Sequence, residues 1–139
     1  MEFSGKKVTV VGTGISGIGA VGLLNAVGAE VVLYDGNEKL KIEDIEKKLG
    51  TYKAEIVLGE LTKELTDSSD LLVISPGVPI DSPVVKAFEA AGVPVWGEVE
   101  LAYAFDKGKV LAITGTNGKT TTTALVGQIV GAYHKDTFV

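Results

Sequence analysis

Cysteine is absent from this sequence of 139 residues, and its absence removes several kinds of chemistry at once. No disulfide, no thiolate metal site and no cysteine nucleophile is possible. No stretch is apolar for long enough to cross a membrane, and the first residues lack an apolar segment of signal-peptide length. We therefore expect a cytoplasmic protein with no membrane partner, and a reducing compartment is compatible with the lack of cysteine.

Positive charge is also in short supply, with 13 basic residues against 18 acidic ones and a net charge of −5. This balance argues against a general nucleic-acid-binding surface, so we expect no nucleic-acid partner. It leaves phosphate binding open, because backbone N–H groups and one lysine can hold a phosphate. With 45% apolar residues the composition is globular, and the length suits one domain, or one domain plus a piece of another.

A glycine-rich turn follows a short β-branched run at residues 8–11, which is typical of a strand buried on both faces. The turn has the G-x-G-x-x-G spacing, and apolar residues with helical spacing follow it. Its first glycine permits a tight turn, its second lets the backbone approach an anionic ligand, and its third lets helix and strand pack closely. The six residues are Gly12, Thr13, Gly14, Ile15, Ser16 and Gly17.

An acidic residue stands at the distance that nucleotide-binding folds use. Residues 30–34 predict a second strand that ends at Asp35, 18 residues beyond Gly17. In dinucleotide-binding folds such a carboxylate accepts a hydrogen bond from a ribose. The alternative is a solvated aspartate at a strand end. We favour the ligand role, because the glycine loop precedes Asp35 at the right distance.

The rest of the first hundred residues alternates between predicted strands and helices. We expect strands at 54–58, 71–74 and 93–96, and helical segments at 38–49, 61–65, after Ser82 and from Glu98 to about Phe105. This alternation predicts an open parallel sheet with helices on both faces. Glu98 and Glu100 favour the start of their helix through its dipole, and we assign them no catalytic role.

A proline and a glycine follow the predicted strand at 71–74 directly. Residues 75–78 fit a type II turn, with Pro76 and Gly77 at its centre, which would expose backbone N–H groups. Ligands bind at the carboxyl ends of strands in open α/β sheets. A ligand loop at Ser75 and Gly77 and an ordinary connection are equally compatible with the sequence.

A second phosphate loop is predicted between a strand at 109–113 and a helix that runs through Val130. Gly118 would let the backbone wrap a phosphate, Lys119 would place a charge on the β- and γ-phosphates, and the Thr120 hydroxyl would ligate Mg²⁺. The general G-x-x-x-x-G-K-[ST] pattern has glycine where this chain has Ile113. A polar turn with a surface lysine is the alternative, and we favour phosphate binding.

With two glycine loops in one short chain, the sequence resembles the Mur ligase family, the ATP-dependent ligases that build the peptide stem of bacterial peptidoglycan. The resemblance rests on residues 12–17, 75–78, 97–101 and 113–120 and covers essentially the whole chain. The family's ATP loop has the form G-T-x-G-K-[ST], which residues 115–120 match, so Ile113 is expected there. Among family members, the likeness is to those that add D-glutamate to UDP-N-acetylmuramoyl-L-alanine.

The resemblance implies three domains: a Rossmann-like domain that holds the UDP moiety, a central P-loop ATPase and a closing C-terminal domain. ATP would phosphorylate the substrate carboxylate, and the amine of D-glutamate would attack the acyl phosphate. Lys119 would be the catalytic residue and Thr120 the Mg²⁺ ligand. The residues implied for the UDP moiety are Gly14, Ile15, Ser16, Asp35, Gly36, Asn37, Ser75 and Gly77. Those implied for ATP are Gly115, Thr116, Asn117, Gly118, Lys119, Thr120 and Thr121.

The same resemblance implies a division at about residue 108. Residues 1–107 would form the UDP-binding domain, and 108–139 the truncated start of the ATPase domain. We expect an N-terminal fragment that binds UDP-sugar without turnover, and whose last part docks on the first domain or self-associates. Two other readings stay open, namely an NAD(P)-binding Rossmann domain and a non-catalytic nucleotide-binding module.

Overall fold

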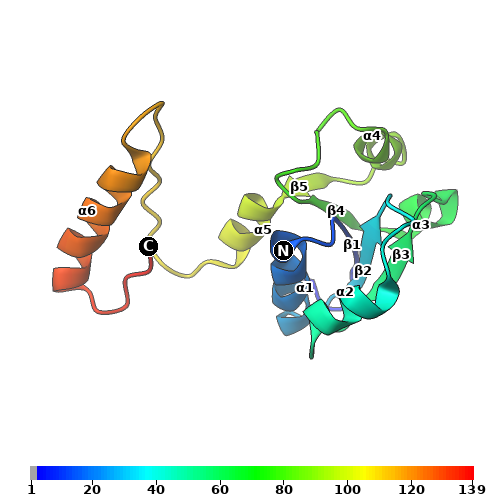
Figure 1. Cartoon of the computed structure of the whole chain (residues 1–139), viewed down its shortest axis with the longest axis horizontal. Helices are drawn as coiled ribbons and strands as arrows, with labels where there is room; N and C mark the ends of the chain where they lie inside the picture. Colours follow the sequence, from blue (N-terminus) through cyan, green and yellow to red (C-terminus); the bar gives the residue numbers. More distant parts are fainter. Residues whose placement is uncertain (1–2) are drawn as a thin grey trace. The chain divides into compact units, whose positions relative to one another are not determined.

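The computed structural model describes residues 3–139, which divide into two compact units with the boundary after Asp106. The first unit contains the sheet, and the second runs from Lys107 to Val139. Figure 1 shows the whole chain, coloured from blue to red along the sequence. The division does not test the functions predicted for residues 1–107 and 108–139, so those assignments stay predictions.

Five parallel strands form the sheet of the first unit, in the order β3-β2-β1-β4-β5. The strands are β1 (Lys7–Val11), β2 (Glu30–Asp35), β3 (Glu55–Leu58), β4 (Leu71–Ile74) and β5 (Val95–Gly97). The helices between and after them are α1 (Ile15–Ala26), α2 (Ile42–Leu49), α3 (Lys63–Ser68), α4 (Pro83–Ala90) and α5 (Glu98–Phe105). The predicted open parallel sheet of the Rossmann-like α/β class is confirmed.

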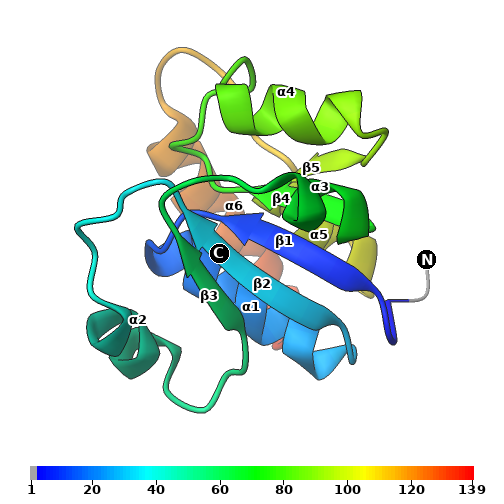
Figure 2. The ribbon, with the colours of Figure 1, turned by 90° about the vertical axis from the view of Figure 1, so that its right-hand side faces the viewer.

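The sheet is buried between two layers of helices, as Figure 2 shows for α4 on one side and α1 and α2 on the other. Val8 and Val10 of β1 pack in one cluster with residues of α1, α2 and α5. Residues of β4 that point to the opposite face pack with α3 and α4, where Phe88 is fully buried. Successive strand residues point to opposite faces, so strands covered on both sides are apolar throughout.

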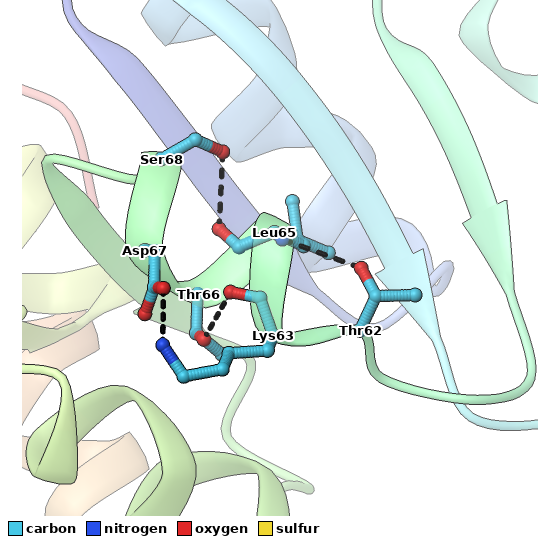
Figure 3. A network of polar contacts seen from close by, with 6 residues as sticks. All are labelled: Thr62, Lys63, Leu65, Thr66, Asp67 and Ser68. Atoms are coloured by element: carbon cyan, nitrogen blue, oxygen red, sulfur yellow. Dashed lines mark hydrogen bonds and ion pairs between the residues drawn. The ribbon is translucent and has the colours of Figure 1, made fainter.

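Two helices of this unit begin later than the sequence predicts. The helix expected at 38–49 begins at Ile42, because Asn37 forms a turn: its side-chain oxygen accepts from the N–H of Lys39 (3.1 Å). The helix expected at 61–65 is α3, Lys63–Ser68. The Thr62 hydroxyl caps it by accepting from the N–H of Leu65 (3.3 Å), as Figure 3 shows. Asparagine and threonine side chains form hydrogen bonds with nearby backbone groups. Such bonds disfavour these residues inside a helix and favour them in the turn or at the N-cap that precedes it.

The second unit contains one helix, α6 (Lys119–Tyr133), within the part of the chain described. The strand predicted at 109–113 is wrong, since these residues have no regular secondary structure and pair with no described strand. An apolar β-branched run has strand propensity, but a strand exists only where a neighbour accepts its backbone hydrogen bonds. Val110 and Leu111 are exposed, at 60% and 65%.

Candidate functional site

Three strands of the first unit, β1, β4 and β5, end in one row of the sheet, and β2 runs one residue further. The residues paired in that row are Tyr34, Val11, Ile74 and Gly97. The residues that follow them in the chain are Asp35, which ends β2, and Gly12, Ser75 and Glu98. Between β1 and β4 the chain order reverses, and this is the position where open α/β sheets bind ligands. The sheet thus brings the first glycine loop and the loop after β4 to one edge.

The glycine loop is shorter than predicted, because Ile15 and Ser16 already form the first turn of α1. Gly14 is the N-cap of α1. The first hydrogen bond of the helix runs from the N–H of Ile18 to the carbonyl of Gly14 (3.1 Å). No side chain in the described residues caps this end, so N–H groups of the first turn are left for a ligand. Ile15 is 96% exposed, and a Cβ at Gly14 would meet nothing within 4 Å.

Two glycines of this loop are required by the backbone. Gly12 has a φ of 107°, which favours glycine. A Cβ at Gly17 would lie 2.0 Å from the carbonyl oxygen of Gly12. The close packing of helix on strand that the third glycine predicts is therefore present, and it holds the loop in one conformation.

Asp35 is tied to the glycine loop by hydrogen bonds. One carboxylate oxygen accepts from both the N–H (3.2 Å) and the hydroxyl (2.9 Å) of Thr13, and the other accepts from the N–H of Asn37 (3.1 Å). Gly36 and Asn37 follow it and are exposed. Asp35 thus braces the loop, and its contact with a ligand stays a prediction.

Tyr34, the neighbour of Asp35, keeps its proton. Burial, and secondarily the Asp35 carboxylate, raises the pKa of the Tyr34 hydroxyl. That hydroxyl donates to the carbonyl of Gly59 (2.7 Å) and so joins the ends of β2 and β3. It is a structural group of this edge.

The loop after β4 turns at Pro76, but the predicted type II turn is wrong. The N–H of Val78 donates to the carbonyl of Ser75 (2.9 Å), which closes a turn of the expected length. Gly77 does not have the positive φ that a type II turn requires at that position. Gly77 is exposed, and the N–H of Ser75 is held by the carbonyl of Val11 (3.2 Å).

Glu98 lies beside the loop after β4, a placement that the sequence does not reveal. The hydroxyl of Ser75 donates to its carboxylate (2.7 Å), which places a half-buried acid at this edge of the sheet. Glu100 has the helix-start role: it accepts from the N–H of Gly97 (2.7 Å). Only the register of β4 and β5, which pairs Ile74 with Gly97, could have distinguished the two acids.

The second loop contains the residues predicted for ATP, and all of residues 115–121 are exposed. Gly118 is the N-cap of α6 with a φ of 76°, and Lys119 is the first residue of the helix. The Lys119 ammonium donates to the carbonyl of Gly115 (2.5 Å), so it folds back over its own loop. Thr120 and Thr121 lie in the first turn, while Thr116 and Asn117 form the bend before it.

Residues 3–139 contain no group of three or more histidine, aspartate or glutamate side chains that could hold a metal ion. None of their helices is long and apolar enough to span a bilayer. A metal at Thr120 would therefore depend on oxygens that a bound nucleotide and water supply.

Comparison with known proteins identifies close relatives. The family model described as "Mur ligase MurD-like, N-terminal domain" matches residues 6–97. A UDP-N-acetylmuramoylalanine–D-glutamate ligase of Lachnospira eligens is 66% identical over 139 residues, which are all of this chain and 31% of that protein. The protein of the same name from Lachnoclostridium phytofermentans is 56% identical over 140 aligned positions, with the same coverage.

A solved structure agrees with these relatives. A pseudomurein peptide ligase type C from Methanothermus fervidus superposes with a TM-score of 0.58 and 27% identity, over 93% of this chain and 26% of that one. The chain thus spans about a third of the length of the relatives it matches.

Proposed function

Because this chain belongs to the Mur ligase family, with the MurD-like N-terminal domain at residues 6–97, we propose that it is the N-terminal part of a ligase that joins D-glutamate to UDP-N-acetylmuramoyl-L-alanine. The observation that carries the proposal is the 66% identity to such a ligase over all 139 residues, both glycine loops included. Ligation would be the activity of the longer protein, with peptidoglycan synthesis in the cytoplasm as its setting. The 139 residues alone would bind the UDP moiety without turnover.

The first unit offers the UDP moiety a site made mainly of backbone. The N–H groups at the start of α1 would hold the diphosphate, because they lack intrahelical acceptors and lie at the positive end of the helix dipole. The absence of a side chain at Gly14 leaves room for close approach, with Ile15 and Ser16 beside it. The remaining contacts would come from two neighbouring strand ends: Asp35, Gly36 and Asn37 after β2, and Ser75 and Gly77 after β4.

The second unit would hold ATP at the start of α6. Lys119 would leave the Gly115 carbonyl for phosphate oxygens, which form stronger, charge-assisted hydrogen bonds. Backbone N–H groups from Gly115 to Gly118 and the hydroxyls of Thr120 and Thr121 would surround the phosphates. The Thr120 hydroxyl would contribute one oxygen ligand to Mg²⁺, beside those of the nucleotide and water.

In the proposed reaction the carboxylate of the UDP substrate takes the γ-phosphoryl group of ATP, and the amine of D-glutamate then displaces phosphate from the acyl phosphate. This chain would contribute binding and orientation of the two phosphate-bearing substrates. Phosphoryl transfer needs little beyond positioning and charge stabilisation, which a backbone cradle and one lysine supply.

Calorimetric titration of the 139-residue chain with UDP-N-acetylmuramoyl-L-alanine, NADH and ATP in separate experiments tests the proposal. We expect saturable heat with the uridine compound and none with NADH. Saturable NADH binding without uridine binding would instead identify a dinucleotide domain. Binding of ATP alone, with no ligation by the longer protein, would indicate a non-catalytic nucleotide module. Light scattering during the same titrations reports self-association, which stays a prediction.

A further inference from the structure

Two glutamates in the first turn of α5 have different partners, although the sequence makes them look alike. Glu100 accepts from the N–H of Gly97 and so caps its own helix. Glu98 instead accepts from the Ser75 hydroxyl (2.7 Å), a contact between residues 23 positions apart in sequence. Glu100 therefore stabilises the start of α5, whereas Glu98 holds the loop after β4.

Ser75 in turn lies directly against the glycine loop. Its hydroxyl oxygen is 3.0 Å from the point where a Cβ of Gly12 would stand, and 3.4 Å from the corresponding point at Gly17. Its N–H donates to the carbonyl of Val11, the residue before the loop. A serine hydroxyl has one proton to donate. Because that proton goes to Glu98, the side chain of Ser75 is fixed in one rotamer against the glycines.

We propose that Glu98 is a positioning residue for the uridine substrate: by holding Ser75, it fixes the wall on which the Gly12–Gly17 loop rests. The role rests on the function proposed above and extends it to a residue that would not touch the substrate. In this proposal the Glu98 carboxylate holds the Ser75 hydroxyl, Ser75 packs against the backbone of Gly12 and Gly17, and the glycine loop receives the diphosphate. A loose Ser75 would leave the glycines free to shift away from the geometry that receives the phosphates.

The hydrogen bond and the charge of Glu98 have opposite consequences for an anionic ligand. The bond orders the loop, whereas a carboxylate near a diphosphate repels it. Glutamine at this position keeps an oxygen that accepts from Ser75 and removes the charge. A positioning role therefore predicts that Glu98→Gln retains substrate affinity and that Glu98→Ala does not.

The test measures the dissociation constant for UDP-N-acetylmuramoyl-L-alanine by calorimetry on the whole 139-residue chain. The variants are Glu98→Ala, Glu98→Gln, Ser75→Ala and the double alanine variant, with Glu100→Ala as the matched control from the same helical turn. We expect Glu98→Ala to weaken binding about fivefold, the effect of one lost hydrogen bond. Ser75→Ala should weaken binding at least as much, because it also removes the contact proposed between Ser75 and the substrate. The double variant should bind like Ser75→Ala, because Glu98 acts through the Ser75 hydroxyl. Glu98→Gln should bind at least as tightly as the parent chain, and Glu100→Ala should bind like the parent despite its lower stability.

Amide hydrogen exchange gives a readout that needs no ligand. Glu98→Ala should speed exchange at the N–H groups of Ser75 and Val78, and Glu100→Ala at that of Gly97. Additive losses in the double variant, or a Glu98→Gln variant as weak as Glu98→Ala, would overturn the inference while leaving the proposed function intact. Unchanged exchange at Ser75 and Val78 in Glu98→Ala would also overturn it. If the parent chain binds no uridine compound, the proposed function fails first.

Discussion

Replacing Gly17 by alanine should destabilise the first unit, whereas replacing Gly19 by alanine should stabilise it. Both glycines lie in α1, two positions apart. A Cβ at Gly19 would meet nothing within 4 Å, so the variant gains only the helix propensity of alanine, about 1 kcal/mol. A Cβ at Gly17 would lie 2.0 Å from the Gly12 carbonyl oxygen, although real Cβ contacts are essentially never closer than 3.0 Å.

The clash at Gly17 cannot be relieved cheaply, because the obstructing atom belongs to a fixed peptide. The Gly12 oxygen would have to retreat by about 1 Å to reach the 3.0 Å limit. It shares its peptide group with the N–H of Thr13, which donates to Asp35 (3.2 Å). Overpacking costs about 1–3 kcal/mol, and a lost hydrogen bond about 1 kcal/mol. With the propensity gain subtracted, we expect Gly17→Ala to lose about 2 kcal/mol.

Tryptophan fluorescence during thermal unfolding measures this difference. Trp96 is the single tryptophan of the sequence and packs edge-on against Phe3 (6.0 Å between ring centroids), so the signal reports on the first unit. One kcal/mol corresponds to about 4–8 °C in Tm for a unit of this size, so the Gly17→Ala midpoint should fall by roughly 10 °C. Equal stability of the two alanine variants would refute the reasoning. So would loss of stability in Gly19→Ala.

Three further perturbations test other parts of the molecule. Phe88→Ala should cost about 3–5 kcal/mol in urea unfolding, because this fully buried ring anchors α4 to the sheet; a loss below 1 kcal/mol would contradict that role. Hydrogen bonds from the Lys6 side chain and, secondarily, from the Lys7 N–H hold the pKa of the Asp70 carboxyl below its usual range. The stability that the Asp70 carboxylate contributes is therefore present at neutral pH and is lost as the pH falls through the lowered folded-state pKa. The stability gap between the parent and Asp70→Asn should therefore close in acid, and a gap independent of pH would exclude this linkage. In the longer protein, Lys119→Ala should abolish ligation and leave calorimetric binding of the uridine substrate nearly unchanged, and equal loss of both would show that Lys119 has another role.

The sequence predicts this sheet well where local pattern and tertiary structure agree. The apolar runs at β1, β2 and β4 are buried on both faces, and nothing else accommodates such runs in a chain of this size. Helix starts are predicted less well. At Asn37 and Thr62 a polar side chain accepts a hydrogen bond from a backbone N–H within three residues. The periodicity of apolar residues does not show whether such an N–H bonds to this side chain or to a helical carbonyl.

The strand predicted at 109–113 fails for a different reason. Residues 109–113 are mostly apolar but contain two β-branched residues, Val110 and Ile113, where β1 has four. β1 also lies between β2 and β4, while residues 109–113 pair with no strand in the described part of the chain. Strand formation depends on contacts distant in sequence, so an apolar run alone does not decide whether a strand forms. The helix after Gly118 needs no such partner for its backbone bonds, which explains why α6 is present beside a strand that is not.

The candidate site shows the same dependence on partners at the level of single side chains. Asp35 can be found from the sequence because its distance from the glycine loop is fixed by one βαβ unit. Glu98 cannot, since its neighbour Ser75 is set by the pairing of Ile74 with Gly97, a register no local motif specifies. Yet the two acids are alike: each accepts a hydrogen bond from one hydroxyl, that of Thr13 or Ser75, at strand ends on either side of Gly12. The glycine loop is thus braced on both sides by carboxylates whose charges are partly satisfied by those hydroxyls, which would let acidic residues stand close to the proposed phosphate site.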